Sequence, residues 1–476
     1  MHGLFWSVAE RTATQGITFA VLLLLARLLG PHNYGLVTLA ATIALFGQML
    51  LGETFSQALI QEKTIEQAHS SSVFWLLTAL GFLASAVQFF AAAAIAGAFA
   101  QPAIAPILQA LSPLLFLSAL QAVPTALLRR DLNFRAIFSA STAGTLAGGI
   151  AAVGMALSGF GIWSLIANLL IQNVILAGTI WHRSGFRPSL EFSQPHLGAL
   201  WSYGRYTLLL RLAAFVANQS PRLIVGYLFG PAVLGSFSLG LRIVEMLYQL
   251  LIIPAANVIV PVIARIRENP QRVETAILGA THMTAVFAAA VYGTLATTAP
   301  VAIPLIFGER WTASVPLVQI LCFYGVIASC GLIWQSILGG LGRPDIALRA
   351  AVAAAAANVG ALVLSAHWGP AAAAGAFVFR GYVTLPFMPL IISRLTGLPA
   401  ARQYGVFIPI AIAACIMVAV QQTAITVLIH RWSAPMLLVG IVAIGTMAYG
   451  LTLYVLDRRA LQKGISALRH LQPVSV

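Results

Sequence analysis

Fourteen apolar stretches, each long enough to cross a bilayer, determine what this chain of 476 residues can fold into. A helix needs about 20 apolar residues to span ~30 Å of hydrocarbon, whereas a membrane barrel would show short strands of alternating apolar and polar residues. Only 8% of the residues are charged, a far smaller share than in a typical soluble domain. The sequence therefore predicts an all-α polytopic membrane protein. Its transmembrane helices are expected near residues 12–29, 35–60, 73–99, 104–127, 136–158, 160–181, 198–228, 232–262, 275–306, 313–338, 346–366, 370–392, 405–429 and 433–456.

One part of the chain repeats another. Residues 11–51 align without a gap with residues 211–251, so that Arg11 matches Arg211. The same offset of 200 matches a Gly-Pro pair in each copy, Gly30-Pro31 with Gly230-Pro231. Internal duplication in a membrane protein is typical of transporters, whose repeats move about a site at their interface.

Two polar linkers divide the predicted helices. Residues 182–197 separate the first six helices from the next six, and residues 393–404 precede a final pair. We therefore expect two pseudo-symmetric six-helix lobes, at residues 1–190 and 191–396. Residues 397–476 should form helices 13 and 14 and a basic cytoplasmic tail.

The positive charges indicate the orientation in the membrane. With the N-terminus inside, eighteen of the 26 Lys and Arg residues lie in or beside cytoplasmic segments, and only Arg310 and Arg431 fall in outer loops. This bias predicts that both termini are cytoplasmic. A basic cytoplasmic face in contact with anionic lipid also accounts for most of the net charge of +14 without a nucleic-acid partner.

The residue types that support catalysis or bind cofactors do not occur at the spacings that known catalytic or cofactor-binding motifs require. Lysine occurs only at Lys63 and Lys463, neither in the glycine-rich context of a P-loop. The three cysteines are isolated in apolar helices, and the histidines lack the spacing of metal ligands. No pair of carboxylates is placed for acid–base chemistry. The sequence predicts a protein that is not an enzyme, with no catalytic residues, cofactor or metal.

Charged residues inside the membrane are the candidates for function, because each costs at least ~2.5 to 3.5 kcal/mol at the centre of a helix. The acids among them are Glu10, Glu53 and Glu245, and the cations in spanning segments are Arg27, Arg205, Arg211, Arg222, Arg242 and Arg380. Four of them fall nearest the midplane, namely Arg211, Arg242, Glu245 and Arg380.

Two of these acids allow a structural interpretation beside a functional one. Arg242 and Glu245 are three residues apart on one helix, so they either neutralise each other or line a cavity together. Glu53 is either a polar group bonded to Gln48 or Gln57, or a coupling site for a proton or cation.

The two lobes differ in charge. Within the membrane, the first lobe balances Arg11 and Arg27 against Glu10 and Glu53, whereas the second carries five arginines against Glu245 alone. A cavity between them should attract anions. Arginine suits phosphate in particular, because its planar guanidinium can hold two oxygens at once.

Three segments resemble a known family. Residues Pro221–Arg242 (PRLIVGYLFGPAVLGSFSLGLR), their counterpart Ala26–Gly35 (ARLLGPHNYG) and the loop Arg129–Arg135 (RRDLNFR) are similar to signatures of bacterial Wzx-type polysaccharide flippases, in the exopolysaccharide branch. These belong to the multidrug, oligosaccharidyl-lipid and polysaccharide exporter superfamily. The resemblance extends over about 400 residues. This chain departs from the family pattern at Pro221, a position where related sequences are expected to carry an acid.

The resemblance implies a flippase that moves an undecaprenyl-diphosphate-linked oligosaccharide across the bacterial inner membrane, for extracellular polysaccharide or O-antigen assembly. It implies that helices one, two, seven and eight line a central cavity, with access alternating between the two sides. Membrane lipids surround the chain, and a polysaccharide polymerase and a chain-length regulator are its expected partners. The alternatives are a lipid II flippase for peptidoglycan synthesis and a cation-coupled multidrug antiporter of the same superfamily.

These arguments select a set of site residues. The expected substrate-binding residues of the cavity are Arg11, Arg205, Arg211, Arg242, Glu245 and Arg380, and Glu53 is a candidate for coupling. The Gly-Pro pairs at Gly30, Pro31, Gly230 and Pro231 are expected to form turns at the outer gate.

Overall fold

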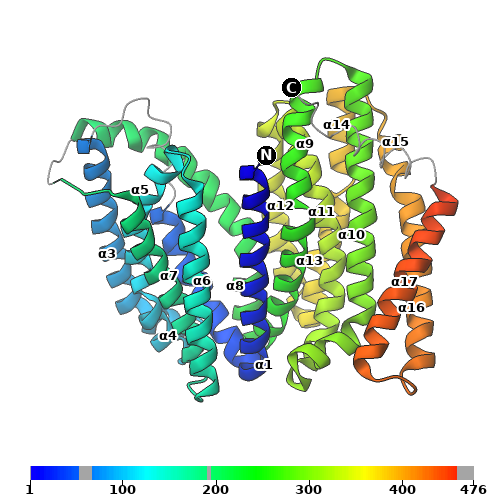
Figure 1. Ribbon diagram of the computed structural model, residues 1–476, viewed down its shortest axis with the longest axis horizontal. Helices are drawn as coiled ribbons and strands as arrows, with labels where there is room; N and C mark the ends of the chain where they lie inside the picture. Colours follow the sequence, from blue (N-terminus) through cyan, green and yellow to red (C-terminus); the bar gives the residue numbers. More distant parts are fainter. Residues whose placement is uncertain (1, 53–66, 190–193, 458–476) are drawn as a thin grey trace. The chain divides into compact units, whose positions relative to one another are not determined.

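The computed structural model describes residues 2–52, 67–189 and 194–457, and its regular elements in these ranges are all helices (Figure 1). The prediction of an all-α protein is thereby confirmed. In chain order the elements are α1 (His2–Gly52), α3 (Gln67–Ala98), α4 (Ile104–Leu111), α5 (Pro113–Arg130), α6 (Phe134–Leu157), α7 (Trp163–Ser184), α8 (Gln194–Leu251), α9 (Ile253–Ile266), α10 (Pro270–Phe307), the 3-10 helix η1 (Glu309–Ser314), α11 (Val315–Gly340), α12 (Pro344–Ser365), η2 (Ala366–Trp368), α13 (Pro370–Thr384), α14 (Phe387–Thr396), α15 (Ala400–Gly405), α16 (Phe407–Leu428) and α17 (Ala434–Leu456).

Twelve segments of the described chain are long and apolar enough to cross a membrane. Two of them, within α1 and α8, contain a residue with non-helical torsion angles. Gly30 has φ 75° and ψ 172°, and Gly230 has φ 79° and ψ −179°. Glycine tolerates a positive φ, and the proline that follows has no N–H to donate and suits the first turn of a new helix. Each Gly-Pro pair therefore ends one helical segment and starts the next.

The chain forms two compact units, residues 1–238 and 239–476. In the first unit, α6 and α7 approach closely at glycines. A Cβ atom at Gly144 would lie 2.6 Å from the main-chain oxygen of Gln172, and one at Gly148 would lie 2.7 Å from that of Asn168. Small residues at such positions allow membrane helices to pack by van der Waals contact along their backbones.

In the second unit, a buried amide joins the last two helices to α10. Gln421 of α16 is fully buried, and its side chain accepts a hydrogen bond of 2.6 Å from Thr297 and donates bonds of 3.3 Å to Thr294 and 3.4 Å to the carbonyl of Ile441. His282 of α10 lies 2.6 Å from Asp457, which follows α17. These polar contacts fix α16 and α17 against the rest of the unit.

Replacing Gln421 with leucine should destabilise this arrangement. Interhelical hydrogen bonds in membranes contribute on average ~0.6 kcal/mol each, so the loss of these bonds should lower the free energy of unfolding by about 1 to 2 kcal/mol. Thermal unfolding of the purified protein measures the effect. The same change at the neighbouring Gln422, which is exposed, should leave the midpoint unchanged, and an equal response at both positions would contradict the structural role of Gln421.

Candidate functional site

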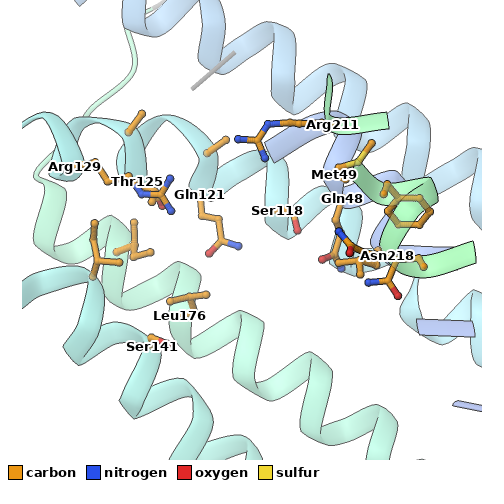
Figure 2. A pocket seen from close by; sticks show the side chains of 17 residues that line it. Gln48, Met49, Ser118, Gln121, Thr125, Arg129, Ser141, Leu176, Arg211 and Asn218 are labelled. Atoms are coloured by element: carbon orange, nitrogen blue, oxygen red, sulfur yellow. The ribbon is translucent and has the colours of Figure 1, made fainter. Parts of the chain in front are cut away.

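A cavity of about 540 Å³ opens in the first unit, between α1, α5, α6, α7 and α8 (Figure 2). Its walls carry many polar side chains, although these helices are otherwise apolar. The described lining residues are Leu45, Gln48, Met49, Ser118, Gln121, Ala122, Thr125, Ala126, Arg129, Ile137, Ser141, Leu176, Ile180, Arg211, Phe215, Asn218 and Gln219.

Helix α5 contributes one continuous stripe of polar residues. Ser118, Gln121, Thr125 and Arg129 are three or four residues apart and therefore lie on one face of the helix. In Figure 2 they follow one another along the wall of the cavity, with Arg129 at one end and Ser118 at the other. At a rise of 1.5 Å per residue the stripe is about 16 Å long.

A proline inside α5 helps to position this stripe. Pro124 has no N–H, so it cannot bond to the carbonyl of Leu120 one turn earlier. The indole Nε1 of Trp181 in α7 donates a hydrogen bond of 3.1 Å to that same carbonyl. The freed acceptor is thus satisfied by α7, and this bond sets α5 and α7 side by side at the cavity.

Helix α8 forms a second wall with the same periodicity. Arg211, Phe215, Asn218 and Gln219 line the cavity at helical spacing, and Arg211 is half-buried. The ring of Phe215 packs 5.2 Å from that of Phe46 in α1, which joins the two helices beside the cavity.

The cavity suits an anionic ligand rich in hydroxyl groups. It presents the guanidinium groups of Arg129 and Arg211, four side-chain amides and three hydroxyls, and none of its described lining residues is acidic. Guanidinium groups bind phosphate oxygens, and amides both donate and accept hydrogen bonds. The hydroxyl of Ser118 is committed to the main-chain carbonyl of Leu114 at 2.7 Å. The arrangement favours binding over nucleophilic chemistry.

The predicted site residues fall into separate parts of the chain. Arg211 lines the cavity of the first unit, while Arg242 and Glu245 are half-buried on the part of α8 that belongs to the second unit. Arg380, on α13, donates a hydrogen bond of 2.5 Å to the carbonyl of Ala354 in α12 and lies 5.9 Å from the centre of the Phe377 ring. These two contacts are with α12 and with its own helix α13.

Three other predicted positions lie wholly or partly outside the described residues. Arg11 belongs to α1 and Arg205 to α8, but the structure does not describe their side chains. Glu53 lies outside the described residues altogether. The cavity and coupling roles of these residues remain predictions.

The two Gly-Pro turns contact each other within the first unit. A Cβ atom at Gly35 would overlap the main-chain oxygen of Pro231, and one at Gly235 would overlap that of Pro31. The contact is reciprocal, as the repeat offset of 200 suggests, and it brings the backbones of the two copies directly together.

Sequence reasoning missed Arg129 and the amides around it. Arg129 is one of the eighteen cations that the sequence places in or beside cytoplasmic segments, and at the end of α5 a cation also interacts favourably with the helix dipole. The spacing of polar residues at 118, 121, 125 and 129 in an apolar helix was the signal that could have revealed the stripe.

Comparison with known proteins identifies the family. The family described as polysaccharide biosynthesis protein matches residues 24–316, which include every described residue of the cavity. The chain belongs to this polysaccharide biosynthesis family. The family resemblance inferred from the sequence is confirmed.

Two individual proteins are also similar to this chain. The succinoglycan biosynthesis transport protein ExoT of Rhizobium meliloti (strain 1021) is 27% identical over 473 residues, which cover 98% of this chain and 95% of that protein. The lipopolysaccharide biosynthesis protein WzxC of Escherichia coli (strain K12) is 22% identical over 364 residues, covering 73% and 71%. Together with the family, these matches confirm that the chain is a transporter and not an enzyme.

Solved structures show the fold of this family member. The lipid II flippase MurJ, in an inward closed conformation, superposes with a TM-score of 0.74 at 14% identity, covering 95% of this chain and 99% of that one. A multidrug resistance MATE family transporter in an inward-facing conformation gives 0.64 at 15% identity, covering 80% and 96%. At these identities the likeness shows the fold alone, which is that of a multi-pass membrane protein.

Proposed function

We propose that this chain is a flippase that moves an undecaprenyl-diphosphate-linked oligosaccharide across the bacterial inner membrane, for extracellular polysaccharide or O-antigen assembly. The observation that carries the proposal is the cavity of the first unit, which combines two arginines with amides and hydroxyls and has no acid among its described lining residues. A multidrug transporter for organic cations would require acidic groups in such a place.

The two kinds of side chain in the cavity match the two polar parts of this substrate. Arg129 and Arg211 supply charge-assisted hydrogen bonds for the diphosphate. Gln48, Gln121 and Asn218 can bond to sugar hydroxyls as donors and as acceptors. The lipid tail stays in the bilayer, so only the polar head needs the shelter of the cavity.

The membrane potential can contribute to the driving force. A diphosphate carries about two negative charges, and outward movement of each gains ~2.3 kcal/mol per 100 mV across the membrane. About 4 to 5 kcal/mol is therefore available when the whole charge crosses, and bound arginines that move with the substrate reduce this gain.

The proposed arrangement has fourteen crossings. The twelve candidate spans include two, in α1 and α8, that a Gly-Pro pair divides into two segments. Counting each half separately supports two six-helix lobes, residues 1–190 and 191–396, followed by α16, α17 and a basic tail in residues 397–476. Both termini are then cytoplasmic. Arg11, Arg205, Arg242, Glu245 and Arg380 complete the proposed cavity set, with Glu53 as the coupling candidate.

Reporter fusions test this topology. Fusions after Arg187 and Arg267 should report a cytoplasmic location, and fusions near Pro231 and Glu309 a periplasmic one. The reason is that loops rich in lysine and arginine remain on the cytoplasmic side of the membrane. The measurement is the activity ratio of a cytoplasmic and a periplasmic reporter at each site. Opposite readings at Arg187 and Pro231 would refute the proposed lobes.

Deleting the gene tests the function itself. Without the flippase, the bacterium should lose its extracellular polysaccharide and accumulate the lipid-linked oligosaccharide in the cytoplasmic leaflet, while its cell wall remains intact. Mass spectrometry of extracted lipids and a polysaccharide assay measure both effects. Lysis with accumulation of lipid II would instead favour a lipid II flippase, and unchanged polysaccharide would refute the proposal. A polymerase and a chain-length regulator are the proposed partners downstream.

A further inference from the structure

A second cavity lies at the arginine-rich end of the first unit. It measures about 590 Å³ and shares no lining residue with the cavity described above. Consecutive arginines at the end of α5 separate the two, because Arg129 lines the first cavity and Arg130 the second. The described lining residues of this second cavity are Gln67, Ser70, Leu127, Arg130, Asp131, Gly185, Phe186 and Arg187.

The loop that forms one wall is held in place on α3. The main-chain oxygen of Arg187 accepts a hydrogen bond of 3.2 Å from the side chain of Gln67. Two residues later, the N–H of Ser189 donates to the hydroxyl of Ser71 at 2.9 Å, and the carbonyl of Ser189 accepts from the Nε1 of Trp75 at 2.9 Å. Arg187 therefore extends from a fixed backbone, opposite the end of α5.

A cluster of aromatic residues lies beside this cavity, as expected of a site at the level of the lipid headgroups. Phe74 makes edge-on contacts with Trp75, Trp181 and Phe186, at centroid distances of 5.3, 5.5 and 5.7 Å. Trp75 is 39% exposed although it is large and apolar. Tryptophan gathers at membrane–water interfaces, where its ring lies among headgroups. Phe186 belongs both to this cluster and to the cavity wall.

We propose that the second cavity binds the headgroup of an anionic phospholipid. Arg130 and Arg187 hold the phosphate, since guanidinium groups fit its oxygens and basic pockets between membrane helices suit anionic headgroups. Gln67, Ser70 and Asp131 offer hydrogen-bonding groups to headgroup hydroxyls. A bound headgroup joins α3, α5 and the loop after α7, and so fixes the end of α5 that also carries Arg129. The site does not depend on which substrate the transporter moves.

Binding of soluble short-chain lipids to the purified full-length protein tests this site. Dihexanoyl phosphatidylglycerol should raise the thermal unfolding midpoint in a saturable way, and dihexanoyl phosphatidylcholine should require about tenfold more lipid or give no rise. The double variant Arg130→Gln, Arg187→Gln should bind phosphatidylglycerol about tenfold more weakly, the loss expected for charge-assisted bonds to one phosphate.

The matched control removes two arginines from the same end of the unit. Arg135 and Arg183 are exposed and do not line the cavity, so the double variant Arg135→Gln, Arg183→Gln should keep the wild-type affinity. If both double variants bind phosphatidylglycerol equally weakly, the effect is one of overall positive charge, and the proposed binding site is wrong. Saturation by sodium phosphate at the concentrations that suffice for the lipid would identify a free-anion site and overturn the lipid assignment. If the first double variant does not fold, the single variants Arg130→Gln and Arg187→Gln carry the same comparison.

Discussion

Alanine at Arg129 or Arg211 should lower polysaccharide export by about ten- to a hundredfold, with the amount of protein in the membrane unchanged. Each side chain lines the proposed substrate cavity, and a hydrogen bond to a charged group contributes ~1.5 to 3 kcal/mol. Since ~1.4 kcal/mol corresponds to a factor of ten, the loss of either guanidinium should weaken substrate binding by that range. Export is measured as extracellular polysaccharide per cell.

Three control variants separate phosphate binding from general charge effects. Lysine at Arg211 keeps the charge but loses the planar fork, so export should be intermediate. Alanine at Arg183 or Arg431, neither of which lines the cavity, should be tolerated. Equal tolerance at Arg129, Arg211 and Arg183 would leave the cavity arginines without a role in transport. The predicted contribution of Arg380 can be measured in the same assay.

Alanine at Gly35 or Gly235 should abolish export, because either methyl group would overlap a main-chain oxygen of the opposite Gly-Pro turn. A main-chain oxygen cannot move aside as the end of a flexible side chain can, so in either alanine variant the two Gly-Pro turns must move apart. In the proposed transporter these turns form the outer gate, which could then no longer close. Alanine at Gly97, which has no neighbour within 4 Å of an added Cβ, should be tolerated and serves as the control.

Crosslinking between the turns reports the separation directly. Cysteines at the exposed positions His32 and Ala232, in a background without the three native cysteines, should crosslink efficiently in the otherwise unchanged protein. Alanine at Gly35 should reduce the yield. Crosslinking should arrest export and reduction should restore it, because in the proposed alternating access the two lobes would part at this point. Full export by a fully crosslinked protein would rule out this gate.

Several features of the fold could be predicted from the sequence because they depend on local properties. Long apolar runs allow only helices in a bilayer, since every backbone group must be bonded within its own segment. The repeat at an offset of 200 predicted that Gly30 and Gly230 are equivalent, and both have nearly the same non-helical torsion angles. Glycine tolerates the positive φ and proline favours the first turn of a new helix, so this break depends on local properties and no tertiary contact was needed to predict it.

The sequence alone determined the helical class, the repeat, the family and the presence of arginines within apolar helices. Only the tertiary structure decided that Arg129 and Arg130, adjacent in the chain, line different cavities, and that Gly35 meets Pro231. Successive residues of a helix point about 100° apart, and which neighbour each one meets depends on the packing of helices far away in sequence. Charge and hydropathy identify which residues are unusual in a membrane, whereas packing determines which of them share a cavity.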